Sequence, residues 1–243
     1  MMLALLAQVG HSEQWELVDV MRVWTVLSQK GGSGKTTLVL HLAMAAIDAG
    51  NAVSIIDLDT QRSAEKWGDL RRRETKKAAP AIVHGLHHDI DRMIDAARGA
   101  ENDLVLIDTP PATNNTTLRA GGVADMIIVP TRSSTLDVEA LRDTLQALAD
   151  AHKLERTVIV LNAANGDKAM LGAIDRIAGS EFGVPIIAPG LRDQSALAVA
   201  LGKGKGITEH GRKSKAAIAV TELLETLLRH SRRIERARKR EHA

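Results

Sequence analysis

The sequence predicts an α/β fold of three layers, in which helices cover both faces of a mostly parallel, twisted sheet of about seven strands. Three observations predict this fold. Short apolar runs that fit buried strands alternate with longer segments whose apolar residues have helical spacing. A glycine-rich turn joins the first apolar run to the first helical segment. Acidic or polar residues follow several of the runs, as they do at the carboxyl ends of parallel strands.

The glycine-rich turn has the context of a phosphate-binding loop. An apolar run at residues 23–27 is followed by Gly31, Gly32 and Gly34, and then by a helical pattern over residues 35–49. Glycine allows the backbone to turn tightly and to come close to a ligand. Loop N–H groups and the positive end of the helix dipole then face a phosphate. The sequence therefore predicts a nucleotide phosphate site at this turn.

Side chains of the same stretch suit a nucleotide bound with Mg²⁺. Lys35 provides a point charge for the β- and γ-phosphates, and the Thr36 hydroxyl is placed to ligate Mg²⁺. The candidate nucleotide-binding residues of the loop are Gly31, Gly32, Ser33, Gly34, Lys35, Thr36 and Thr37.

The loop departs from the common phosphate-loop pattern. Gln29 stands where that pattern requires glycine, and a second lysine, Lys30, precedes the double glycine. Gln-Lys-Gly-Gly-Ser-Gly-Lys-Thr-Thr resembles the deviant loop of the ParA/MinD family of ATPases. The resemblance implies the three-layer P-loop NTPase fold, ATP and Mg²⁺ as cofactors, and a Lys30 that reaches across a dimer interface to the partner's nucleotide. The alternative for Lys30 is a solvated loop lysine.

A second motif follows the strand predicted at residues 52–56. It contains Asp57 and Asp59 and is similar to a switch segment of the same family. The resemblance implies that Asp59 polarises the attacking water and that Asp57 supports the Mg²⁺ shell. Thr60 stands in place of the usual proline and Arg62 in place of glycine, so the hydrolysis rate does not follow from the resemblance. An ordinary acidic turn is the alternative.

A third motif ends the buried strand predicted at residues 104–107. Asp108 follows it, 73 positions after Lys35, and begins Asp-Thr-Pro-Pro. An aspartate in this place holds Mg²⁺ in phosphate-loop enzymes, and the tetrapeptide resembles the family's Walker B element. Residues 112–122 then fit a mobile second switch that senses the γ-phosphate.

A polar helix is predicted between the second and third motifs, over residues 62–77. Its basic end is interpreted as a solvated face, with a DNA contact as the alternative: Arg71, Arg72, Arg73, Lys76 and Lys77. The histidines and aspartates that follow are a weak candidate metal site, because no histidine or carboxylate recurs at an orienting spacing and the region fits a loop and a helix start: His84, His87, His88, Asp89 and Asp91.

Two later positions concern the nucleotide base. A strand ends in Asn162, and a short last strand at residues 184–187 is followed by Pro189. The family resemblance implies that Asn162 reads the adenine and that the Pro189 segment wraps the base. A turn asparagine that caps the next helix is the alternative for Asn162.

Charge is distributed unevenly along the chain. Residues 192–243 contain 13 Lys and Arg against 6 Asp and Glu, whereas residues 1–191 contain 19 against 24. A basic C-terminal fifth indicates a polyanionic partner, with a merely solubilising surface as the alternative. The candidate DNA-binding residues surround a glycine turn and the entry to a final helix predicted at 216–229: Arg192, Lys203, Lys205, Arg212, Lys213 and Lys215.

Composition excludes several classes of protein. Three tryptophans and one phenylalanine are the only aromatics, which disfavours single-stranded nucleic acid binding by base stacking. The absence of cysteine excludes the iron–sulfur members of the superfamily and fits a reducing cytoplasm. No run approaches the ~20 apolar residues of a membrane span, and the basic end of the chain lacks the apolar face of a membrane-inserting helix.

These observations predict a lead-in segment at residues 1–20, a ParA-like ATPase domain at 21–230 and a basic tail at 231–243. The predicted protein is a bacterial, cytoplasmic, nucleoid-associated ATPase that dimerises with ATP and binds duplex DNA without sequence preference. A ParB-like or other cargo adaptor would stimulate its slow hydrolysis. The alternatives are an ATP-dependent ligase or synthetase similar to dethiobiotin synthetase, a MinD-like membrane ATPase, and an inert DNA-binding scaffold.

Overall fold

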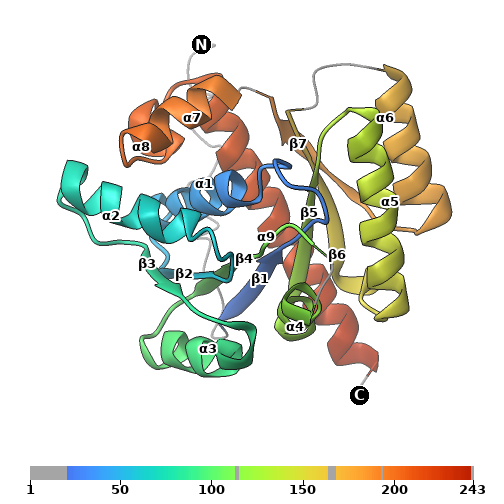
Figure 1. Cartoon of the computed structure of the whole chain (residues 1–243), viewed down its shortest axis with the longest axis horizontal. Coiled ribbons are helices and arrows are strands. Elements are labelled where there is room, and N and C mark those ends of the chain that lie inside the picture. The colour runs from blue at the N-terminus through green and yellow to red at the C-terminus, as the bar shows by residue number, and fades with distance from the viewer. Residues whose placement is uncertain (1–20, 113–114, 164–167, 193, 242–243) are drawn as a thin grey trace, which may run out of the picture.

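The fold is a seven-stranded parallel sheet between two layers of helices, which confirms the predicted fold class (Figure 1). A computed structural model describes residues 21–112, 115–163, 168–192 and 194–241, so the predicted lead-in at 1–20 lies outside the described residues. The strand order is β3-β2-β4-β1-β5-β6-β7, and every pair is parallel. The strands are β1 (Arg22–Val26), β2 (Val53–Asp57), β3 (Ala81–His84), β4 (Leu104–Asp108), β5 (Met126–Thr131), β6 (Thr157–Asn162) and β7 (Ile186–Leu191).

Helices connect the strands and cover the two faces of the sheet. One layer contains α1 (Lys35–Asp48), α2 (Ser63–Thr75), α7 (Gln194–Gly202), α8 (Ile207–His210) and α9 (Lys215–Glu241). The other contains α3 (Ile90–Gly99), α4 (Asn115–Val123), α5 (Thr135–Asp150) and α6 (Lys168–Asp175). The short turns are His87–Asp89, Leu154–Arg156 and a π-helical turn at Arg176–Glu181.

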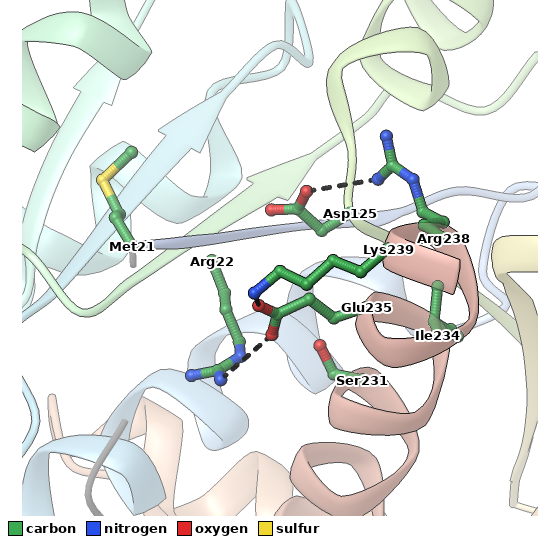
Figure 2. A pocket seen from close by; sticks show the side chains of 8 residues that line it. All are labelled: Met21, Arg22, Asp125, Ser231, Ile234, Glu235, Arg238 and Lys239. Atoms are coloured by element: carbon green, nitrogen blue, oxygen red, sulfur yellow. Dashed lines mark hydrogen bonds and ion pairs between the residues drawn. The ribbon is translucent and has the colours of Figure 1, made fainter. Parts of the chain in front are cut away.

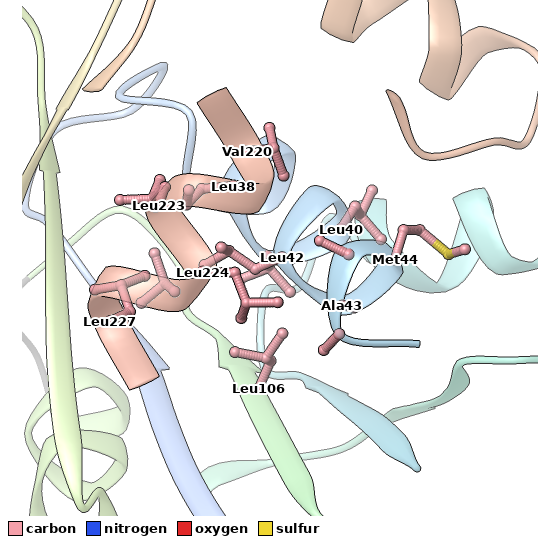
Figure 3. Packing of buried hydrophobic residues seen from close by; sticks show 14 of the residues in the cluster. Leu38, Leu40, Leu42, Ala43, Met44, Leu106, Val220, Leu223, Leu224 and Leu227 are labelled. Carbon is pink, nitrogen blue, oxygen red and sulfur yellow. The ribbon is translucent and has the colours of Figure 1, made fainter. Parts of the chain in front are cut away.

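The core is divided between the two faces because successive side chains of a strand point to opposite sides. On β4, Leu104 and Leu106 belong to the cluster under α1 and α9, whereas Val105 and Ile107 belong to the cluster under α3. Figure 3 shows Leu106 beneath the facing leucines of α1 and α9. The central strands are therefore apolar on both faces, as the continuous runs predicted.

The final helix is longer than predicted. The sequence predicted a helix at 216–229 and a separate tail from 231, but α9 runs without interruption from Lys215 to Glu241. Ser231 and Ile234 are buried against the body of the protein, so this stretch continues the packed helix. The predicted second switch also contains a helix, α4, in its described part.

Strand register sets the position of the acidic motifs. β1 lies in the centre of the sheet between β4 and β5, and Asp57 and Asp108 are direct register partners on β2 and β4. Both aspartates end their strands at the carboxyl edge of the sheet, beside the loop that leaves β1. Open parallel sheets bind ligands at this edge.

Candidate nucleotide-binding site

The glycine loop between β1 and α1 has the backbone shape that its sequence predicted. Gly32 and Gly34 have φ angles of 75° and 91°, in the left-handed region that favours glycine. The hydroxyls of Ser28 and Ser33 are 2.7 Å apart and close the base of the loop. Gly34 directly precedes α1, so the loop delivers its backbone to the N-terminus of a 14-residue helix.

Lys35 lies inside the loop. Its Nζ donates to the carbonyl oxygens of Ser28, at 3.4 Å, and Lys30, at 3.2 Å. Burial lowers the pKa of the Lys35 ammonium, while the negative charges of Asp108 and Asp59 oppose this shift. A phosphate in the loop would therefore replace two carbonyl contacts with a full negative charge.

Asn162 contacts the phosphate loop itself. Its Nδ2 donates to the carbonyl oxygen of Ser33 at 2.7 Å, and the residue is buried at the end of β6. A Cβ at Gly34 would lie 1.9 Å from the same Nδ2, so glycine is required there for space as well as for φ. The structure thus places Asn162 under the loop, whereas the role of adenine reader stays a prediction.

Asp108 and Thr36 form the best candidate for Mg²⁺ coordination. Thr36 Oγ1 donates to Asp108 Oδ2 at 2.6 Å, and Asp108 Oδ1 is buried without a hydrogen-bond partner among the described residues. Burial raises the pKa of Asp108 to about 7 against the Thr36 hydrogen bond, and the charge of Asp57 adds to the rise. A buried carboxylate oxygen and a hydroxyl are ligands that a hard cation such as Mg²⁺ prefers, so these residues fit the ion.

Asp57 anchors the start of α2. Its Oδ2 accepts from the N–H groups of Ala64, at 3.0 Å, and Glu65, at 3.1 Å, while Oδ1 accepts from Asp59 N at 3.0 Å. Burial raises the pKa of Asp57, and these three N–H donors oppose the shift. Asp57 therefore stabilises the N-terminal end of α2, in addition to its predicted place in the Mg²⁺ shell.

Asp59 is more accessible than Asp57. It is half-buried on the loop after β2, and its Oδ1 accepts from Gln61 N at 2.9 Å. The two aspartates thus occupy different environments. The assignment of Asp59 to the attacking water stays a prediction.

Lys30 has an ionic partner that sequence reasoning missed. Its Nζ is 2.7 Å from Asp137 Oδ1 and 3.5 Å from Ser134 Oγ, at the start of α5. The Lys30 side chain is 31% exposed, so it is neither free in solvent nor part of the core. Ser134 and Asp137 have the spacing of a helix cap, and Ser134 Oγ accepts from Asp137 N. That spacing predicts where the helix starts, but it does not predict the ion pair with Lys30.

A further cation approaches the loop from β5. Arg132 Nη1 donates to the Gly32 carbonyl oxygen at 3.4 Å, and the Arg132 side chain is exposed. Arg132 directly follows β5, and nothing in the local sequence indicates contact with the loop. Together, Lys30, Lys35 and Arg132 give the loop three cationic side chains.

The remaining predicted residues fall outside the loop. Five candidate DNA-binding side chains are exposed and Lys205 is half-buried: Arg192, Lys203, Lys205, Arg212, Lys213 and Lys215. Pro189 lies within β7, so the segment predicted to wrap the base is part of the last strand. Within the described ranges, no group of three histidine or acidic side chains could hold a metal ion, which argues against the weak candidate near His87.

One prediction for the α2 helix was wrong. Arg71 was interpreted as part of a solvated basic face, but its side chain is only 3% exposed and pairs with Glu209 of α8. Arg72 and Arg73 are exposed, as predicted. Arg71 follows Ala64 by seven positions and Trp67 by four, so it shares the buried face of α2 with them.

A large cavity lies far from the phosphate loop. It has a volume of about 430 Å³ and lies at the other end of the sheet, between the start of β1 and the C-terminal part of α9 (Figure 2). Arg22, Asp125, Glu235 and Lys239 are among its lining residues. A space of about 10 Å³ lies directly behind the loop, near Ser28 and Asp137.

Comparison with known proteins identifies the family. Residues 24–207 match the model of the CobQ/CobB/MinD/ParA nucleotide-binding domain. The chain belongs to this family. The matched range begins in β1, includes all three acidic and glycine-rich motifs, and ends at the start of α8.

Two curated relatives place the chain more narrowly. It is 25% identical over 231 residues to the chromosome-partitioning ATPase Soj of Thermus thermophilus, a match that covers 83% of this chain and 93% of Soj. It is 35% identical over 127 residues to the maintenance of carboxysome distribution protein A of Gloeobacter kilaueensis, where the match covers 51% of this chain and 55% of the relative. The chain is thus an ATPase of the ParA and MinD type.

Solved structures share the fold. The apo McdA structure from Cyanothece has a TM-score of 0.66 and 19% identity, with 86% of this chain and all of that chain covered. MinD from Aquifex aeolicus has a TM-score of 0.68 and 18% identity, with 86% and 97% covered. Among the residues that the structure describes, no helix is long and apolar enough to cross a membrane.

Proposed function

We propose that this chain is a ParA-type positioning ATPase, in which ATP closes two protomers into a dimer that binds duplex DNA. The observation that carries the proposal is the position of Lys30. It sits on the phosphate loop with 31% of its side chain exposed, and it pairs with Asp137, a buried carboxylate at the start of α5. Because the Lys30 ammonium is partly exposed, it can exchange Asp137 for a partner's phosphate, while Ser134 Oγ stays hydrogen-bonded to the Asp137 carboxylate.

Catalysis would rest on positioning and charge neutralisation. Lys35 and, from the partner, Lys30 would contact the phosphates. Thr36 and Asp108 would hold the metal with Asp57 behind them, and Asp59 would orient the attacking water. Two buried, adjacent carboxylates support this arrangement, because a cation offsets their mutual repulsion.

Binding to DNA would be of the backbone type. Exposed basic side chains lie at the end of β7, before α8 and before α9. Their arrangement shows no geometry for reading base sequence. We therefore expect contacts to phosphate and a steep loss of DNA affinity with salt. A cargo-bound adaptor would then trigger hydrolysis and release. The names of the relatives, which include chromosome-partitioning and carboxysome-distribution proteins, support a positioning role on the nucleoid.

Membrane insertion is not part of the proposal. The apolar face of α9, which includes Leu223, Leu224, Leu227 and Leu228, is buried against the sheet and α1. The exposed face of its last turns is basic. An amphipathic membrane anchor needs an available apolar face.

The test is duplex-DNA binding at low and moderate salt, without nucleotide and with ADP, ATP or a non-hydrolysable ATP analogue. Wild type is compared with Lys30→Ala and with Lys66→Ala, which removes an exposed lysine of α2 as a control. The proposal expects binding that requires ATP or the analogue, ignores DNA sequence and is lost only in Lys30→Ala. Binding that ignores nucleotide, or no binding under any condition, would contradict it.

A metabolic ligase is the second candidate. Cobyrinic acid a,c-diamide synthase from Mycobacterium smegmatis shares the fold, with a TM-score of 0.66 and 23% identity over 87% of this chain and 95% of that one. Such an enzyme needs no Lys30 and no basic surface. ATP turnover that depends on a small organic acid, and that Lys30→Ala leaves unchanged, would favour this candidate.

A further inference from the structure

Arg71 ties the middle of α2 to the segment between α7 and α8. Its Nε donates to the Ala79 carbonyl at 2.6 Å and its Nη1 to the Gly204 carbonyl at 2.8 Å. The guanidinium also pairs with Glu209 through two bonds, Nη1–Oε2 at 2.6 Å and Nη2–Oε1 at 3.1 Å. A buried bidentate pair of this kind fixes orientation as well as distance.

The segment around Gly204 packs directly on α2. Gly204 has a φ of 63°, and a Cβ there would lie 2.7 Å from Arg71 Cα. Trp67, one turn earlier on α2, donates from Nε1 to the Leu201 carbonyl at 3.1 Å. Glu209 completes the attachment by accepting from Gly206 N at 3.4 Å. The backbone from 201 to 206 therefore follows the position of α2.

Two of the candidate DNA-binding residues flank this attachment. Lys203 and Lys205 are the immediate neighbours of Gly204, and Lys203 is exposed. Lys77 adds a second cation to Glu209, with Nζ 3.0 Å from Oε1. The charges on this surface are thus held by contacts with α2 and not only by their own loop.

The other end of α2 is attached to the nucleotide site. Asp57, register partner of Asp108, holds the N–H groups of Ala64 and Glu65. Seven residues separate Ala64 from Arg71, about 10 Å along one uninterrupted helix. One stiff element therefore joins the acidic end of β2 to the loop that carries Lys203 and Lys205.

We propose that Arg71 and Glu209 are positioning residues that couple the nucleotide state of the site to the basic loop at residues 202–206. The inference rests on the proposed function for its DNA readout. A nucleotide with Mg²⁺ changes the interactions available to Asp57 and Asp108. Asp57 binds the N-terminal end of α2, and Arg71, on the same helix, binds the loop at residues 202–206. A shift of the helix therefore displaces Lys203 and Lys205 with it.

The test compares Glu209→Gln and Arg71→Lys with a matched control pair on the same helix. The control is Arg72→Lys with Asp69→Asn, which alters an exposed ion pair next to Arg71. The readout is the ratio of duplex-DNA affinity with a non-hydrolysable ATP analogue to that without nucleotide. We expect this ratio to fall at least fivefold in the two test variants, within the usual range of coupling between sites, and to stay unchanged in the control.

Binding of the analogue separates coupling from simple loss of structure. The inference expects the affinity for the analogue and the cooperative thermal transition to be kept in Glu209→Gln, which preserves the shape of the side chain. An unchanged DNA ratio in both variants would overturn it. Loss of analogue binding together with DNA binding would overturn it as well, because the pair would then only support the fold.

Hydrogen exchange tests the coupling without DNA. In wild type, exchange of the amides at 203–206 is expected to change when the analogue and Mg²⁺ are added, and this response is expected to be lost in Glu209→Gln. If wild type binds no DNA but shows the response, the proposed function fails and the coupling stands. If the exchange does not respond in wild type, the coupling is wrong whatever the DNA result.

Discussion

Lys30 and Asp137 form an ion pair of 2.7 Å between the phosphate loop and the first turn of α5. Burial alone would raise the pKa of Asp137, but hydrogen bonds from Lys30 and Ser134 and the charge of Lys30 lower it. The carboxylate is therefore ionised and holds the ammonium within one protomer. For Lys30 to contact a partner's nucleotide, this pair must break.

Release of Lys30 is expected to ease ATP-dependent dimerisation. Asp137→Asn keeps the helix cap geometry but removes the charge, and partly exposed ion pairs are worth about 1 kcal/mol. The analogue concentration at half-maximal dimer formation should fall about fivefold, as measured by light scattering. Asp143→Asn, at an exposed position of the same helix, is the control. An unchanged concentration would show that the pair does not restrain Lys30.

The two glycines with left-handed backbones are expected to tolerate alanine differently. Gly32→Ala meets open space and should cost about 1 kcal/mol of unfolding free energy from its φ alone. Gly34→Ala also collides with Asn162, so it should cost several times more and abolish nucleotide binding. Urea denaturation and binding of a fluorescent ATP analogue measure both effects. Asn162→Ala should restore part of the stability of Gly34→Ala; equal effects at the two glycines would contradict the close contact.

Asp108→Asn is expected to raise the stability of the protein and to lower its ATPase activity. The substitution removes a buried charge whose Oδ1 has no partner among the described residues, so the nucleotide-free protein should gain about 1 kcal/mol. It also removes a candidate Mg²⁺ ligand, and Mg²⁺-dependent ATP hydrolysis should fall at least about 100-fold. Calorimetry and a phosphate-release assay test the two halves. Retained hydrolysis would place the metal elsewhere.

The charge of Glu209 makes the free energy of unfolding depend on pH. Burial would raise its pKa, but hydrogen bonds and charges from Arg71 and Lys77 lower it to about 2 from an ordinary value of 4.5. As pH falls, the unfolded chain takes up the proton first. The stabilisation by Glu209 is therefore fully present above about pH 4.5 and is lost between there and about pH 2, on the order of 1–3 kcal/mol.

Comparison with Glu209→Gln measures this contribution. The variant should be less stable than wild type at pH 7 and should lose less stability on acidification through the same window. Glu222→Gln, at an exposed position of α9, should lose as much unfolding free energy as wild type over the same pH window. Parallel curves of unfolding free energy against pH for wild type and Glu209→Gln would contradict the paired geometry.

Local sequence was sufficient for the strands, the phosphate loop and the acidic positions. The runs at β1 and β4 were predicted because each is apolar on both faces, and the loop because its glycines are needed within a few residues of one another. Thr36, Asp57 and Asp108 were predicted because each follows its strand or loop directly. The length of α9 was missed because its last turns bury few apolar residues, among them Ile234.

The sequence by itself determined which residues surround a phosphate, since the groups that make the loop are adjacent in the chain and their conformation is local. Only the tertiary structure decided what holds them. Lys30 with Asp137, Asn162 with Ser33 and Arg71 with Glu209 are each pairs of distant segments. Their contacts depend on strand order and on how helices pack across the sheet, and no periodicity or spacing within one segment records the distance to another.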